Sequence, residues 1–113
     1  MSTIDRPTFE RLAQDLGADF VGELSETYCL ETPQLIAQLS QALASQNAAA
    51  FRQAAHSIKS TSNTLGALQL GTLAQELETM GRAGNLADVH GQVDQLAAEY
   101  DRVEQTLKDL THG

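Results

Sequence analysis

The stretch FRQAAHSIKSTSNTLGA, residues 51–67, decides the fold because its apolar residues recur at helical spacing. On a helix that advances about 100° per residue, small and apolar side chains share one face, which we predict to be buried. The members of this face are Phe51, Ala54, Ala55, Ile58, Ser62 and Leu65. The opposite flank carries polar and charged residues: Arg52, His56, Lys59 and Asn63. We therefore predict that His56 is exposed, with Lys59 as its neighbour about one turn along.

The rest of the chain also shows helical periodicity, with glycine, asparagine and proline residues at the interruptions. No segment alternates apolar and polar residues with a period of two, so we predict no strand. The expected helices span about residues 7–16, 19–44, 48–64, 68–80 and 86–110, with a loop at 81–85. These helices are amphipathic and their joints are short. We therefore predict an all-α protein, an antiparallel four-helix bundle with a short additional N-terminal helix.

Individual residues indicate where these helices begin, bend and end. We expect Asp19 to cap the second helix and Asn47 to cap the third, because both side chains can accept a hydrogen bond from a first helical turn. Pro33 is expected to kink the second helix, and Gly66 is expected to end the third with a positive φ. Apolar positions expected on the core side of the helices include Leu16, Phe20, Leu24, Leu86 and Val89.

Composition narrows the class of protein. The 113 residues suffice for one hydrophobic core, so we expect a single domain over residues 1–113. A formal net charge of −8 argues against nucleic acid or an anionic membrane surface as a partner. No apolar run is long enough to span a bilayer, and the N-terminus lacks the features of a signal peptide. Together with the single cysteine, Cys29, these features predict a cytoplasmic protein.

Charge is distributed unevenly around His56. No Asp or Glu lies between Glu31 and Glu76, and the charged residues of that interval are Arg52 and Lys59. One explanation is that short helices vary in charge by chance. The other is that a binding site for a phosphoryl dianion excludes carboxylates.

A histidine beside a cation suits phosphoryl transfer. An ordinary imidazole, with a pKa of about 6.5, is largely neutral near pH 7, and its nitrogen can attack an acyl phosphate because that group has a good leaving group. Lys59 lies where it can stabilise the charge that develops on the phosphoryl oxygens. The sequence holds no glycine-rich phosphate loop, no carboxylate pair on this face and no metal-ligand set. We therefore predict a helix that receives and donates a phosphoryl group without using ATP.

The central motif is His56-x-Ile58-Lys59-Ser60-x-Ser62-x-x-x-Gly66-Ala67, followed by Leu70, Leu73 and Leu77-Glu78. It resembles the histidine phosphotransfer (HPt) domain of multistep two-component relays. The resemblance implies a monomeric four-helix bundle in which His56 accepts a phosphoryl group from a receiver-domain aspartate and passes it to another receiver domain, reversibly. It also implies that Lys59 assists the phosphoryl group and that Gly66 lets the next turn pack against the histidine helix.

Further site residues surround the motif. We expect partner contact at Arg52, Ser60, Asn63, Gly66 and Glu78, with exposed positions of the second helix at the edge. Glu78 lies where members of the family place a polar residue near the histidine; alternatively, it is a solvated helix glutamate. Ser60 departs from the family pattern, which usually has glycine there, and serine either weakens docking or adds a hydrogen bond to the phosphoryl group.

The partners implied by the resemblance are response-regulator receiver domains and a hybrid sensor kinase. The Mg²⁺ that transfer needs would belong to the receiver, so we expect no cofactor and no metal site in this chain. Met1 and the compact length favour a free-standing protein, and His90 and His112 are expected to be surface residues. Two other functions stay open, namely a helical adaptor that carries no phosphate and an autonomous enzyme, for which a nucleotide site is missing.

Overall fold

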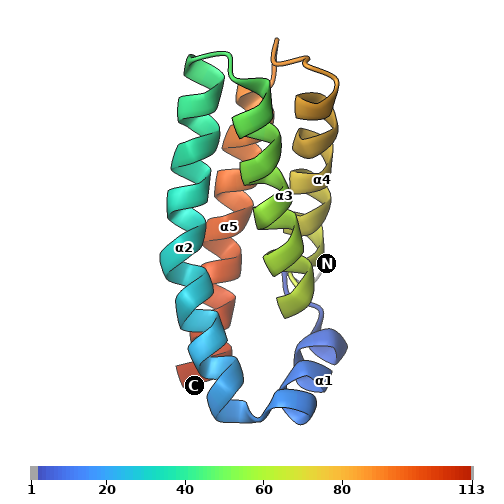
Figure 1. Cartoon of the computed structure of the whole chain (residues 1–113). Helices are drawn as coiled ribbons and strands as arrows, with labels where there is room; N and C mark the ends of the chain where they lie inside the picture. Colours follow the sequence, from blue (N-terminus) through green and yellow to red (C-terminus); the bar gives the residue numbers. More distant parts are fainter. Residues whose placement is uncertain (1–2, 113) are drawn as a thin grey trace.

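The computed structural model describes residues 3–112 of the chain, and for His112 it describes the backbone alone. In these residues the structure contains no strand, and its helices are α1 (Arg6–Leu16), α2 (Ala18–Ala44), α3 (Ala48–Leu65), α4 (Leu68–Arg82) and α5 (His90–His112). Figure 1 shows α2, α3, α4 and α5 side by side with successive directions reversed, while α1 lies across one end. The predicted fold, an antiparallel four-helix bundle with a short N-terminal helix, is confirmed.

The longest helix sets the dimensions of the bundle. α2 has 27 residues, which at about 1.5 Å per residue span the long axis of the molecule, 41 Å. It is one helix that includes Pro33. Its N-cap is Gly17, whose φ of 92° also ends α1, rather than the predicted Asp19. Asp19 lies in the first turn, where its negative charge interacts favourably with the positive end of the helix dipole.

The ends of α3 are as the sequence predicts. At its start, Asn47 Oδ1 accepts a hydrogen bond from the Ala50 N–H at 3.1 Å. At its end, Gly66 takes a left-handed conformation with φ 90°. The Asp5 N–H donates to the Gly66 carbonyl at 2.7 Å, and a Cβ on Gly66 would lie 3.0 Å from the Asp5 oxygen. Glycine is therefore required both for the backbone angle and for the close approach of the N-terminal segment.

Two predicted boundaries are wrong. The region 81–85 was expected to be a loop, but α4 continues to Arg82 and buries Gly81 against the backbone of Arg52. The last helix begins at His90 rather than near residue 86. Leu86 and Val89 are buried as expected, but they lie in the preceding connection. The buried apolar residues of this connection therefore have the same spacing in the sequence as the buried face of a helix.

The core is one cluster of buried apolar side chains from every helix. Ser62, a polar residue on the predicted buried face of α3, is 0% exposed and shares a 2.7 Å hydrogen bond with the Tyr28 hydroxyl of α2. Leu16 and Phe20 were expected on the core side but are about half exposed, and Val21 is buried instead. Within residues 3–112, no helix is both long and apolar enough to cross a membrane.

Candidate functional site

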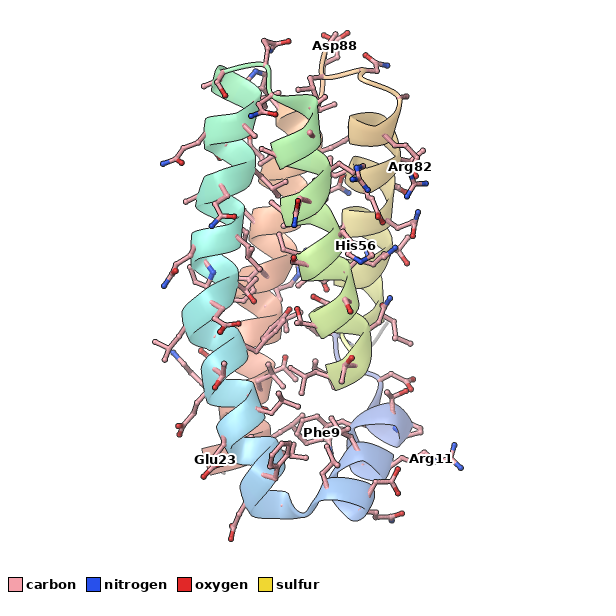
Figure 2. The ribbon with its side chains drawn as sticks, in the orientation of Figure 1. Phe9, Arg11, Glu23, His56, Arg82 and Asp88 are labelled. Carbon is pink, nitrogen blue, oxygen red and sulfur yellow. The ribbon has the colours of Figure 1, made fainter. Side chains whose placement is uncertain are left out.

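His56 lies near the middle of α3, on the side that faces away from the core. Its side chain is 57% exposed, whereas Ala55 and Ile58 on the opposite face are 0% exposed. The helical wheel of the sequence thus placed His56 correctly. Figure 2 shows His56 on the outer surface of α3, directed towards α4 and not into the bundle.

A buried carboxylate lies directly behind the histidine. Glu78 of α4 is 1% exposed, and its Oε2 lies 2.8 Å from His56 Nδ1. The Lys59 ammonium donates a hydrogen bond to the other oxygen, Oε1, at 2.6 Å. The hydrogen bond from Lys59, opposed by burial and assisted by the bond from His56, holds the pKa of the Glu78 carboxyl below its ordinary value. Glu78 is therefore an ionised, buried partner of the histidine rather than a solvated glutamate.

The carboxylate fixes the state of the imidazole. An ionised carboxylate only accepts hydrogen bonds, so the atom that donates in the His56–Glu78 contact is Nδ1. In a neutral ring the other nitrogen, Nε2, then carries the lone pair. Among the described residues, Nε2 has no hydrogen-bond partner. The geometry thus presents a nucleophilic nitrogen to solvent and holds the opposite nitrogen in place.

Two cationic side chains, Lys59 and Arg82, pair with the Glu78 carboxylate. Lys59 is 22% exposed and also donates to Gln75 Oε1 at 3.1 Å. Arg82, one turn after Glu78 on α4, lies with Nη2 3.4 Å from Oε2 and is 61% exposed. Of the two explanations for the lack of Asp and Glu between Glu31 and Glu76, exclusion of carboxylates from the site does not fit the contact between Glu78 and His56. The carboxylate is tolerated because cations on both helices neutralise it.

Close contact between α3 and α4 brings Glu78 to the histidine. Gly81 lets the α4 backbone approach Arg52, since a Cβ at Gly81 would lie 3.0 Å from the Arg52 nitrogen. On the other side of Glu78 along α4, a Cβ at Gly71 would overlap the side-chain amide of Asn63. Glycines thus flank Glu78 on α4 and allow a helix spacing that its side chain can bridge.

On its other side, His56 borders an open groove of about 530 Å³ between α2 and α3. Its lining is polar except for Leu35, and comprises Glu31, Gln34, Leu35, Gln38, His56, Ser57, Ser60 and Thr61. The groove brings Ser60 and exposed positions of α2 together with the histidine. A partner that reaches Nε2 therefore meets side chains of both helices.

The other predicted contact residues divide into exposed and buried groups. Arg52 and Asn63 are exposed on α3, as predicted. Gly66 is buried under Asp5 at the end of α3, and Glu78 is buried behind His56. Gly66 nevertheless borders an open pocket together with Asp5 and Leu68, and contact of either residue with a partner stays a prediction. Both residues also hold the structure around the site.

Other functional candidates are less informative. His90 is exposed at the start of α5, as predicted, and the side chain of His112 lies outside the described residues. Among the described residues, no three His, Cys, Asp or Glu side chains are grouped as a metal site would require. Arg82 was not predicted as a site residue, because the sequence around it indicated a loop at 81–85. The available signal was its spacing of four residues after Glu78, which on a helix indicates an ion pair.

Comparison with known proteins gives a consistent result. A family model described as the Hpt domain matches residues 23–106. The chain is 26% identical over 106 residues to the phosphorelay protein LuxU of Vibrio vulnificus, from strains YJ016 and CMCP6, with 94% of this chain and 90% of the relative covered.

Solved structures give the same result. The crystal structure of histidine-containing phosphotransfer protein B (HptB) from Pseudomonas aeruginosa PAO1 matches with a TM-score of 0.92 and 27% identity, over 97% of this chain and 95% of the other. The HPT domain of a sensor hybrid histidine kinase from Shewanella shares the fold, with a TM-score of 0.80 and 18% identity over 96% of this chain and 92% of that one. The family model spans most of the bundle, including His56 and Glu78, and the chain belongs to the Hpt domain family.

Proposed function

We propose that this chain is a phosphorelay intermediate, which accepts a phosphoryl group on His56 from a receiver-domain aspartyl phosphate and passes it to another receiver domain. The observation that carries the proposal is the exposed imidazole whose Nδ1 is bonded to the buried Glu78 carboxylate at 2.8 Å. Relatives named as a phosphorelay protein and as a histidine-containing phosphotransfer protein support it.

The reaction follows from the state of the ring. The Nε2 lone pair attacks the phosphorus atom, the P–N bond forms, and the P–O bond to the aspartyl carboxylate breaks. The ring then carries a positive charge and keeps its Nδ1 proton, which stays hydrogen-bonded to Glu78. A fixed carboxylate stabilises this charged ring in the way that the aspartate of a catalytic triad stabilises an imidazolium. Return transfer to a second receiver is the reverse of these steps.

Lys59 supplies positive charge beside the reacting nitrogen. Two of its three ammonium N–H groups are used by Glu78 and Gln75, and the third remains for a phosphoryl oxygen. In the transition state, negative charge is spread over the oxygens of the phosphoryl group. A cation beside these oxygens therefore stabilises the transition state more than the ground state. Lys59 therefore both holds Glu78 and stabilises the phosphoryl group.

The receiver docks, in this proposal, over the groove between α2 and α3 that His56 and Ser60 border. A docked receiver contributes its own Mg²⁺ with its aspartyl phosphate, so this chain carries the phosphoryl group without a cofactor of its own. The protein acts as a carrier and not as a kinase, because the phosphoryl group comes from a partner. A hybrid sensor kinase is the proposed upstream donor, and the carrier works as a monomer.

The decisive experiment is phosphoryl transfer from a receiver domain that has been charged on its aspartate. Wild type should take up label that is labile in acid and stable in base, and His56→Gln should take up none. Exposed His90 offers a matched control, because His90→Gln should label like wild type.

Each outcome separates the candidates. Label that appears equally in wild type and His56→Gln contradicts the assignment of His56. Receivers that bind without any transfer favour an adaptor of the same fold. Acid-labile label from ATP alone, with no receiver present, indicates an autonomous kinase.

A further inference from the structure

We infer that Arg82 is a second phosphoryl-binding residue of this site, which leaves Glu78 and contacts the phosphoryl oxygens when His56 carries the group. The inference rests on the proposed function and adds a residue that the motif around His56 does not contain. Its basis is the unequal way in which Lys59 and Arg82 hold one carboxylate.

Position makes the contact possible. Arg82 Nη2 and His56 Nδ1 both lie against the same oxygen, Glu78 Oε2, at 3.4 and 2.8 Å. The guanidinium is thus next to the imidazole already, and Figure 2 shows Arg82 and His56 on the same side of the bundle, at neighbouring levels. The side chain is 61% exposed, so few contacts prevent it from turning outward.

The two cations are not equally available. The Lys59 contact is short, at 2.6 Å, and its side chain is mostly covered. The Arg82 contact is long, at 3.4 Å, and exposed, so its release costs little. A buried carboxylate that loses every cation is strongly destabilising. Lys59 can remain with Glu78 while Arg82 moves, whereas the reverse would leave the carboxylate with the weaker partner.

A phosphoryl group attracts arginine more strongly than Glu78 does. It brings close to two negative charges, and its oxygens match the two parallel N–H groups of a guanidinium. The attraction of Arg82 to Glu78 is also reduced after transfer. The imidazole of His56 has then become positive, and its Nδ1–H group neutralises part of the charge of the Glu78 carboxylate. Transfer itself therefore shifts Arg82 from the carboxylate to the phosphoryl group.

The test uses phosphoramidate, a small phosphoryl donor that needs no receiver. In this reaction the P–N bond to ammonia breaks, ammonia leaves with the protons on its nitrogen, and the P–Nε2 bond forms. We compare wild type, Arg82→Ala and Arg82→Lys for the rate of labelling of His56 and for the lifetime of the label. Arg82→Ala should shorten the lifetime about two- to five-fold, and Arg82→Lys should restore part of it, since lysine offers a point charge without the two parallel N–H groups of a guanidinium.

Arg102 provides a matched control. It is an exposed arginine, 58% exposed, that pairs with a buried glutamate, Glu99, at 2.7 Å on α5. α5 packs against α2 and α4, whereas His56 lies on α3. Arg102→Ala therefore removes the same kind of ion pair away from His56 and should leave the lifetime unchanged.

A second readout separates phosphoryl binding from a purely structural role. A cation that touches the phosphoryl group favours its dianion, so the pH midpoint of the phosphorus NMR shift should be higher in Arg82→Ala than in wild type. If Arg82 only neutralises Glu78, neither this midpoint nor the lifetime changes in Arg82→Ala, and the inference is overturned. Label from phosphoramidate but from no receiver contradicts the proposed function alone, and wild type that labels from neither donor contradicts both.

Discussion

The buried carboxylate of Glu78 makes the stability of the protein depend on pH. Its pKa lies below the ordinary value of 4.5 because Lys59 and His56 donate hydrogen bonds to it, so the unfolded chain binds more protons than the folded one. The stabilisation is present above the ordinary pKa and is lost as pH falls through the lower, folded-state pKa. Urea denaturation should therefore show the free energy of unfolding of wild type falling below about pH 5, and falling less steeply in Glu78→Gln.

The control for this prediction is Glu76→Gln, which changes an exposed glutamate two residues earlier on α4. Its pH profile should follow that of wild type. Identical slopes for Glu78→Gln and wild type would mean that Glu78 contributes nothing to the acid sensitivity. The comparison uses slopes and not absolute stabilities, because the glutamine also replaces a charged hydrogen-bond acceptor.

Single residues also show what the sequence could and could not predict about the site. The exposure of His56 follows from the periodicity of its own helix, which is local information. The contact with Glu78 depends on the rotation and spacing of α4 against α3, which no local pattern determines. The sequence placed Glu78 near the histidine only by resemblance, and Arg82 was lost because three closely spaced residues, Gly81, Gly84 and Asn85, indicated a loop.

At the scale of helices, the α3–α4 contact depends on Gly81. A Cβ at this position would lie 2.9–3.0 Å from Arg52 Cβ, Cα and N, which are backbone or next to it and cannot turn away. Gly81→Ala should therefore force α4 outward, lower the free energy of unfolding by about 1–3 kcal/mol, and slow transfer to His56 because Glu78 moves with the helix. Thermal denaturation and the receiver transfer assay measure the two effects.

Gly22→Ala is the matched control for this helix prediction. Gly22 lies inside α2, and a Cβ there would meet nothing within 4 Å. Alanine should stabilise the protein at this position by about 0.5–1 kcal/mol, because glycine costs more conformational entropy in a helix. A stabilising effect of both substitutions would contradict the close approach of α4 to α3.

The boundaries of α3 were predictable because a characteristic residue marks each of its ends. Asn47 and Gly66 are such marks, and both ends of α3 agree with the sequence. The start of α5 was not predictable from apolar spacing, because Leu86 and Val89 are buried in a connection that packs as tightly as a helix. The apolar spacing at this place reflects burial of the two side chains. Apolar spacing alone does not distinguish a buried connection from a helix.

For the whole molecule, the continuous core predicts that residues 3–112 unfold as one cooperative unit. Ile4 is 1% exposed at the α1 end, next to the Asp5–Gly66 hydrogen bond. Tyr28 and Tyr100 report on the α2–α5 contact, with ring centroids 6.0 Å apart, in a chain that contains no tryptophan. Ile4→Ala should remove about 2–4 kcal/mol of unfolding free energy and lower the midpoints of tyrosine fluorescence and far-UV circular dichroism equally.

Exposed Leu30, at 72%, supplies the control, since Leu30→Ala should change stability by no more than about 0.5 kcal/mol. Two separate midpoints in Ile4→Ala, with the tyrosine signal unchanged, would mean that the α1 end melts independently of the bundle. That result would contradict the single domain, and it would also free the C-terminal end of α3 that Gly66 anchors. One shared midpoint means that a change at the N-terminal segment weakens the same structure that holds Glu78 against His56.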